Sequence, residues 1–404
     1  MTIYKEQFYV DANWQAAGGW VDSTKIISGG LLTLTAVTDY STSLWTRTGF
    51  SGLDCIVVAK TSTSGGNPQI HVRETDADNF LTAYIDSSGG NFVIAKRVSG
   101  TLTTLSTEAI TDFSTANNYT IIVKVFGNAL HAILLGPDDK TINHLIEVSS
   151  DVSDQTGVLA GVGCGAVAVY QSVDLRTVKI MTTLVCLGDS NTNGNNIPQA
   201  DEFPEVMNAR RRFDNIVCVN SGKAGDNIAE CEARIATEVT PYFVAGHRNA
   251  CVMQMGTNDR ADGFTAAQSW VRYQSCIATV KAAGFEAYVN NGFPNTKADA
   301  ANTQWNEDLN ADIMADEATY GYTAIDVWTP FGGTIGSGFP YSVALLWVTA
   351  NNPHASAEGH LIFAREVLEK VKNNSRALSS ARTQSSARTL SSRSLIAQDR
   401  LINS

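Results

Sequence analysis

The sequence predicts a multidomain protein in which an N-terminal all-β sandwich of the jelly-roll type precedes a three-layer α/β domain. Three observations predict this division. Short apolar runs separated by Gly, Ser, Asn and Asp fill residues 1–180, which is the pattern of a sandwich. Apolar runs alternate with helix-length amphipathic stretches over residues 181–373, which indicates a parallel sheet covered by helices. Residues 374–404 form a Ser- and Arg-rich tail that has neither pattern.

Bulk composition limits the classes of function. The chain has 404 residues, enough for two or three domains, and 44% of them are hydrophobic. A formal net charge of −11 argues against a general nucleic-acid binder. No stretch is long and apolar enough to span a membrane, and residues 1–10 lack the apolar segment of a secretory signal peptide. We therefore expect no nucleic-acid partner, no membrane span and no signal peptide.

The cysteines and histidines indicate neither disulfides nor a metal site. The seven cysteines are odd in number and contain no Cys-x-x-Cys pair, and several lie inside apolar runs, namely Cys55, Cys186, Cys218 and Cys251. Buried free thiols are the simplest interpretation, and they fit folding in a reducing compartment. The six histidines form no cluster with metal-ligand spacing, so we expect no metal.

The clearest element of the N-terminal region is a β-hairpin. The apolar stretch 119–126 is followed by Gly127-Asn128 and then by a second apolar stretch, 129–135, which is the pattern of two strands joined by a two-residue turn. Further strands are expected at 31–35, 55–59, 69–73, 80–85 and 92–95.

This region resembles the concanavalin-A-like, LamG-type sandwich domains. The resemblance rests on Arg73, on Asp78-Asn79-Phe80, on the hairpin, and on Gly161-Val162-Gly163 before a closing strand. Such domains often bind carbohydrate, so the resemblance implies carbohydrate binding, and a spacer or oligomerisation module is the alternative. Three exposed tryptophans could stack on sugars, although we expect at least two of them to pack in the core: Trp14, Trp20 and Trp45.

The α/β region begins with the turn Gly188-Asp189-Ser190, which directly follows the apolar run 184–187. The carboxyl end of a parallel strand is where open α/β sheets bind their ligands, and the turn places the Ser190 hydroxyl there. The tripeptide alone is a weak signal, since a plain strand-to-loop turn has the same composition. Further strands are expected at 216–219, 250–253, 287–291 and 324–328, and helices at 226–242, 264–283, 299–318 and 361–371.

Three later segments supply the groups that a reacting serine needs. Gly225 follows the second predicted strand, and a glycine there lets a backbone N–H approach a reacting oxygen. Asn258 follows the third strand, and its side-chain amide is a neutral donor to an oxyanion. His354 precedes the last predicted helix, and histidine is the natural base for a serine hydroxyl.

In this order the four segments resemble the SGNH, or GDSL-type, hydrolase family over about residues 182–373. The resemblance implies a flavodoxin-like sheet and no cofactor. It implies Ser190 as the nucleophile and His354 as the base. It also implies an oxyanion hole made by the backbone N–H groups of Ser190 and Gly225 and by the side-chain amide of Asn258.

The sequence departs from the family at the residue that orients the histidine. Where the family has aspartate three residues before the histidine, this chain has Asn351, and Ala355 stands where the family tends to have proline. Loss of that charge weakens stabilisation of the imidazolium, although an asparagine carbonyl still accepts from Nδ1–H. Three alternatives follow: a Ser190–His354 pair oriented by Asn351, another acid in its place, or a degraded site that only binds.

The tail repeats a hexad in which Arg376, Arg382 and Arg388 recur every six residues. An even period places all three arginines on one face of an extended chain. A disordered basic tail is one interpretation. Assembly through residues 376–404, either as a homo-oligomer or as part of a larger particle such as a virion, is the other.

These observations together predict a serine esterase that removes O-acetyl groups from a polysaccharide through an acyl-enzyme. The alternative is a virion or surface carbohydrate-binding protein whose hydrolase domain is weakly active or inactive. An enzyme that acts on polysaccharide without a signal peptide is explained by a phage tail or other virion protein released by lysis. Otherwise we expect a cytoplasmic protein or one exported by a non-classical route.

Overall fold

A computed structural model describes residues 3–6, 14–16, 23–28, 31–36, 45–47, 52–62, 66–165, 167–210, 214–292, 300–331 and 354–372. Several sequence predictions lie outside these residues: the role of Asn351, the tail 376–404 and the environment of Trp20. The side chains of Trp14 and Trp45 lie outside them as well.

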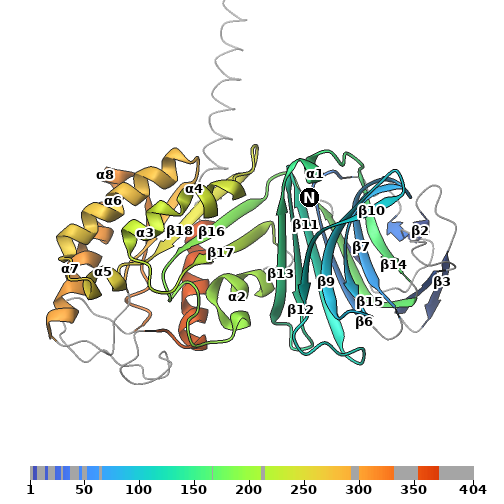
Figure 1. Ribbon diagram of the computed structural model, residues 1–404, viewed down its shortest axis with the longest axis horizontal. Coiled ribbons are helices and arrows are strands. Elements are labelled where there is room, and N and C mark those ends of the chain that lie inside the picture. The colour runs from blue at the N-terminus through green and yellow to red at the C-terminus, as the bar shows by residue number, and fades with distance from the viewer. Residues whose placement is uncertain are drawn as a thin grey trace, which may run out of the picture.

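The N-terminal region consists of two antiparallel sheets that face each other (Figure 1). The first sheet has the order β13 (Thr141–Val148), β12 (Ala129–Leu135), β11 (Asn118–Phe126), β6 (Cys55–Ser62), β15 (Val167–Thr177), β4 (Leu31–Ala36) and β3 (Ser23–Ser28), with β1 (Ile3–Glu6) paired to β15. The second sheet has the order β10 (Thr101–Ala109), β9 (Asn91–Val98), β8 (Asn79–Asp86), β7 (Pro68–Asp76), β14 (Leu159–Cys164), β5 (Trp45–Arg47) and β2 (Trp14–Ala16).

The predicted hairpin is confirmed. Strands β11 and β12 pair with Phe126 opposite Ala129, and Gly127 turns the chain with a φ of 53°. Side chains of β11 alternate between two cores, since Ile121 and Val123 face the second sheet while Ile122 and Phe126 face outward. The first sheet is therefore apolar on both faces, and its outer face needs a partner.

The α/β region supplies that partner and has the flavodoxin-like order that the sequence predicts. Its five parallel strands run β17 (Ile216–Gly222), β16 (Thr182–Gly188), β18 (Arg248–Gln254), β19 (Glu286–Asn290) and β20 (Thr323–Ile325), which is the order 2-1-3-4-5. Strand β16 pairs with β17 on one side and with β18 on the other, so the chain order runs in opposite directions on its two sides. The turn after β16 therefore opens at the switch point where such sheets bind ligands.

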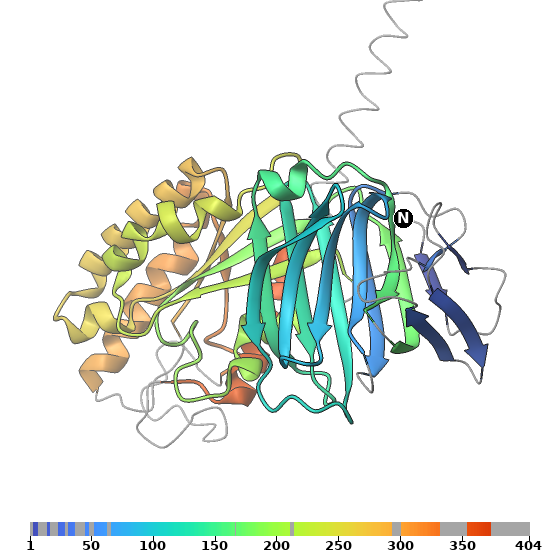
Figure 2. The ribbon, with the colours of Figure 1, turned by 45° about the vertical axis from the view of Figure 1, so that its right-hand side comes forward.

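Helices cover both faces of this sheet (Figure 2). One face carries α3 (Ile228–Ala233), α4 (Ile235–Glu238), α6 (Ala266–Ala282) and α7 (Ala300–Ala315), and the other carries α2 (Phe203–Arg210) and the helical residues 357–372. Shorter elements are α1 (Ser150–Ser153), η2 (Gln199–Asp201), η3 (Thr240–Tyr242), α5 (Thr257–Ala261) and α8 (Glu317–Tyr320).

The prediction of one helix over residues 226–242 is wrong. The stretch 226–242 is not a single helix but α3, α4 and η3 in succession. Arg234 stands at the junction of α3 and α4, and its guanidinium donates hydrogen bonds to the carbonyls of Gly188 and Ser221 at the ends of β16 and β17. Thr240 then begins η3, and Pro241 follows within its first turn, where the missing N–H costs no helix hydrogen bond.

The two regions meet through buried contacts between the first sheet and the α/β region. Apolar side chains of β6, β11 and β12 pack against Val217 and Val244 in one shared cluster. The ammonium group of Lys124 is fully buried there and donates to the backbone carbonyls of Asp214 and Ile216. Burial lowers the pKa of Lys124 to about 8, because the interior disfavours the charged form.

All seven cysteines are buried free thiols, as expected from their place in apolar runs. Burial raises the pKa of Cys55 and Cys251 to about 12, so these thiols stay protonated at neutral pH. Among the described helices, none combines the length and apolar character needed to cross a bilayer.

Candidate active site

The turn that carries Ser190 is fixed by the close approach of two strands. A Cβ on Gly188 would lie 2.1 Å from the carbonyl oxygen of Gln254, so only glycine fits at the end of β16. The next N–H, from Asp189, donates to that same carbonyl at 3.2 Å. The Asp189 carboxylate accepts from the N–H of Asn191 at 2.9 Å. These contacts hold Ser190 at the carboxyl edge of the sheet.

The structure brings Ser190 and His354 together. The Nε2 atom of His354 lies 2.9 Å from Oγ of Ser190, although 164 positions separate the two residues in the chain. This is the separation that proton transfer from a serine hydroxyl to an imidazole requires. Ser190 is 7% exposed, so its oxygen is sheltered from water but still reachable.

Two asparagines of the turn after Ser190 also contact the imidazole. The amide of Asn195 lies 3.4 Å from Nε2 of His354, and the amide of Asn196 lies 3.3 Å from Nδ1. Asn196 has a φ of 71°, in the left-handed region that asparagine tolerates better than most residues. The Asn196 contact holds the ring nitrogen that faces away from Ser190.

Burial tunes the titrating groups of the site. Desolvation lowers the pKa of His354, which favours the neutral imidazole that can accept a proton. Desolvation also raises the pKa of Asp189 to about 7, against the lowering effect of its hydrogen bonds from Asn191. The Asp189 carboxylate accepts its hydrogen bond within the turn, from Asn191, so it acts on the shape of the turn.

Two backbone donors at the site have no acceptor within the described residues. The N–H groups of Ser190 and of Gly225 donate no hydrogen bond there. Gly225 has a φ of 93°, and open space surrounds the position where a side chain would begin. Nδ2 of Asn258 donates to the carbonyl of Asp226 at 2.7 Å, which joins the third predicted segment to the second. An amide nitrogen has two hydrogens, so this bond leaves Asn258 a second donor.

Arg234 ties these segments to one another. Its guanidinium donates to the carbonyl of Gly188 at 3.1 Å and to the carbonyl of Ser221 at 3.1 Å. Its Nε donates to the carboxylate of Asp226 at 2.7 Å. One planar cation therefore joins the strand before Ser190, the strand before Gly225 and the turn that carries Gly225. Such charge-assisted bonds are stronger than neutral ones.

A buried carboxylate secures the third segment. Asp259 follows Asn258 directly, is 0% exposed, and accepts from the N–H of Ile228 at 2.8 Å. Arg272 donates to its other oxygen at 3.0 Å. Burial raises the pKa of Asp259, and these two donors oppose that rise. The contact fixes the start of α3 against α5, and thus Asn258 against Gly225.

Sequence reasoning missed the supporting residues. A lone arginine in a helical stretch reads as a solvated surface residue, so nothing in the pattern singles out Arg234. Asn195 and Asn196 lie in a turn that is rich in asparagine and threonine, which gives no signal of a contact with a histidine far along the chain. Within the described residues, no group of three His, Cys, Asp or Glu side chains is arranged to hold a metal ion.

Comparison with known families supports a hydrolase domain. Residues 186–362 match the GDSL-like lipase/acylhydrolase family, and this segment contains Ser190, Gly225, Asn258 and His354. The C-terminal part therefore has the fold of a GDSL, or SGNH, hydrolase. A comparison with curated protein sequences finds no match.

Several solved structures resemble part of the chain at low identity. A lipolytic protein of the G-D-S-L family from Veillonella parvula is 18% identical, covers 46% of this chain and 97% of its own, and gives a TM-score of 0.40. An acetyl xylan esterase from Geobacillus stearothermophilus is 17% identical, covers 48% and 97%, and gives 0.39. A carbohydrate-binding module from Bacillus subtilis is 14% identical, covers 41% and 93%, and gives 0.30. At these scores the substrates and ligands of those proteins are not transferred to this chain.

Proposed function

We propose that the GDSL-family domain of residues 186–362 is a serine ester hydrolase in which Ser190 and His354 perform the chemistry. The observation that carries the proposal is the 2.9 Å contact between Oγ of Ser190 and Nε2 of His354 at the switch point of the sheet. The family match over the same residues supports it.

In the proposed mechanism, Oγ of Ser190 attacks the ester carbonyl while Nε2 of His354 accepts the hydroxyl proton. The carbonyl oxygen becomes an oxyanion, which would accept hydrogen bonds from the N–H groups of Ser190 and Gly225 and from the side chain of Asn258. Each such donor contributes roughly 3 kcal/mol to the transition state. His354 then returns the proton to the leaving alcohol, and water hydrolyses the acyl-enzyme by the same steps in reverse.

Orientation of the imidazole is shared in this proposal. Asn351 stands where the family has aspartate, and its carbonyl would accept from Nδ1–H. Asn196 contacts the same ring nitrogen at 3.3 Å, and its amide oxygen would serve equally if it faces the ring. Both are neutral, so the imidazolium gains less stabilisation than a carboxylate would give.

The proposed substrate is an O-acetyl group on a polysaccharide. The support is architectural, since the hydrolase domain shares a buried interface with a two-sheet region of the kind that often binds carbohydrate. No cofactor takes part in the proposed mechanism. Assembly through residues 376–404, within a homo-oligomer or a virion, belongs to the same proposal, and mass spectrometry of purified particles would test the virion assignment.

Replacement of the nucleophile tests the enzymatic proposal. Ser190→Ala should reduce hydrolysis of p-nitrophenyl acetate and acetate release from acetylated xylan by roughly a thousandfold or more. The fold should survive, because Ser190 lies on a turn outside the apolar clusters. Equal turnover by the variant and the wild type would remove Ser190 from the mechanism. Absence of turnover in both would favour the alternative, a carbohydrate-binding protein with an inactive hydrolase domain.

A further inference from the structure

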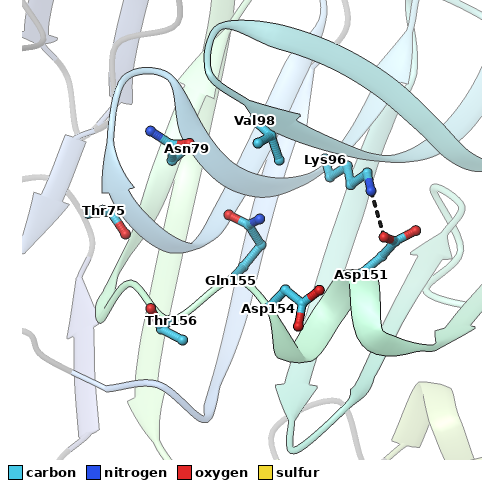
Figure 3. Close-up of a pocket in the computed structure, with 8 residues that line it drawn as sticks. All are labelled: Thr75, Asn79, Lys96, Val98, Asp151, Asp154, Gln155 and Thr156. Carbon is cyan, nitrogen blue, oxygen red and sulfur yellow. Dashed lines mark hydrogen bonds and ion pairs between the residues drawn. The ribbon is translucent and has the colours of Figure 1, made fainter.

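A polar pocket opens on the N-terminal region, away from Ser190 (Figure 3). Its volume is about 420 Å³, which falls in the range of small-molecule sites, roughly 300–1,000 Å³. The lining comes from β7, β8, β9, α1 and the segment that follows α1, and it consists of Thr75, Asn79, Lys96, Val98, Asp151, Asp154, Gln155 and Thr156. The α/β region contributes none of these residues.

The walls of the pocket are held by contacts beneath them. Buried Arg73 donates to the carbonyl of Val152 at 2.6 Å, which ties α1 to β7. The carboxylate of Asp76 accepts from the N–H of Asp78 at 2.9 Å and from the amide of Asn79 at 2.8 Å. The pocket is therefore preformed on fixed elements, which lowers the entropic cost of binding a ligand.

The consecutive residues Asp154, Gln155 and Thr156 carry the binding capacity. Their side chains make no hydrogen bond to any described residue, whereas Asn79 and Lys96 are already engaged. Figure 3 shows Gln155 projecting toward the space between Asn79 and Lys96, with Asp154 beside it. A carboxylate, an amide and a hydroxyl thus line one side of the pocket, and together they both accept and donate hydrogen bonds.

The charges of the pocket define the class of ligand. Lys96 lies 2.6 Å from Asp151, so its positive charge is compensated inside the lining. The remaining charge is the carboxylate of Asp154, which repels anions and accepts from hydroxyl groups. Val98 is the one apolar residue of the lining, and no aromatic ring is among the residues that form it. This chemistry suits a neutral, hydroxyl-rich ring that is held by hydrogen bonds rather than by stacking.

We propose that this pocket binds a neutral saccharide unit through Asp154, Gln155 and Thr156. It would be a second glycan contact, separate from the hydrolytic site. The proposal takes the glycan nature of the substrate from the proposed function, but the binding itself needs no turnover.

The test uses the full chain with Ser190→Ala, so that no ester is consumed. Saturation-transfer NMR and calorimetry would be run with methyl glycosides of glucose, xylose, galactose and mannose, with N-acetylglucosamine, and with glucuronic acid as the anionic probe. We expect at least one neutral saccharide to bind, glucuronic acid to bind more weakly, and Asp154→Ala/Gln155→Ala to weaken binding at least about tenfold. The control is Glu108→Ala. Glu108 is exposed on β10, which pairs with β9 and contributes no residue to the pocket, so this change should leave binding unchanged.

Three results would overturn the proposal: no saccharide of the panel binds, glucuronic acid binds best, or the double variant binds as the control does. Thermal melts of the double variant verify that it is folded, and Thr156→Val supplies a milder change in the same wall. Hydrolysis of p-nitrophenyl acetate by Asp154→Ala/Gln155→Ala with Ser190 intact separates the two proposals. Saccharide binding without any esterase activity would leave the pocket standing and remove the proposed enzymatic function.

Discussion

The turns of the proposed active site and the pocket of the N-terminal region use polar side chains in opposite ways. At the turns, Arg234 and Asp259 form hydrogen bonds with other parts of the protein, and these bonds hold Ser190, Gly225 and Asn258 in place. In the pocket, Asp154, Gln155 and Thr156 have no partner among the described residues, on walls that are fixed from below. The difference teaches that chemistry needs preorganised groups, whereas recognition of a hydroxylated ligand needs groups left unsatisfied.

The largest expected effect on the catalytic side comes from His354. His354→Ala should lower kcat/KM by roughly a thousandfold, because Ser190 loses its base. In the wild type, kcat/KM should fall as pH decreases through the pKa of His354, since the protonated ring cannot accept the serine proton. Burial lowers that pKa, so the loss should begin below the ordinary value of 6.5. A pH–rate profile with an acid limb above that value would contradict this reading of the site.

Arg234 tests whether preorganisation is what the catalytic side depends on. Arg234→Met should reduce kcat by roughly 10- to 100-fold with a smaller change in KM, because the donors lose their alignment while the reacting groups remain. The acid limb of the pH profile should not move, since His354 is not a partner of Arg234. Arg365→Met, which changes an exposed arginine, is the matched control. Equal rates in both variants would show that the turns hold their shape without Arg234.

Asn351 should have a smaller effect, in the opposite direction. Asn351→Asp should preserve the rate or raise it by roughly a few fold, because a carboxylate stabilises the imidazolium that forms during turnover. Measurement of kcat at several pH values would also detect the rise in the pKa of His354 that a nearby negative charge produces. A large drop in kcat in a folded variant would instead show that another group, such as Asn196, orients the ring.

Deletion of residues 376–404 should change catalysis least. The deletion begins after residue 372, the last described helical residue, so it removes none of the described strands and helices that hold Ser190 and His354. Hydrolysis of p-nitrophenyl acetate should stay at the wild-type rate, while sedimentation should show loss of an assembled species if the arginines bind a partner. If the full-length and truncated chains sediment with the same mass, the proposed role of residues 376–404 in assembly is wrong.

The sequence allowed the sheet order of the α/β region and the hairpin at 119–135 to be predicted, because both depend on local patterns of apolar and turn residues. It also singled out Ser190 and His354, which the structure places in contact. The break within 226–242 was not predicted, because it follows from long-range bonds of Arg234 to strand ends. The pocket was equally hidden, since Asp154-Gln155-Thr156 reads as an ordinary polar loop. The jelly-roll and LamG assignments of the N-terminal region stay predictions.

Lys124 gives the molecule a fixed internal geometry. Its buried ammonium group donates hydrogen bonds to two carbonyls at the start of β17, beside an apolar cluster shared by the two regions. Two regions joined by such a buried interface keep one distance from each other, whereas domains on a flexible linker sample many distances. A glycan held in the pocket would therefore present its ester groups to Ser190 at one preferred spacing along the polymer. Effective concentration would be high for acyl groups at that spacing and near zero for those that the fixed frame cannot reach.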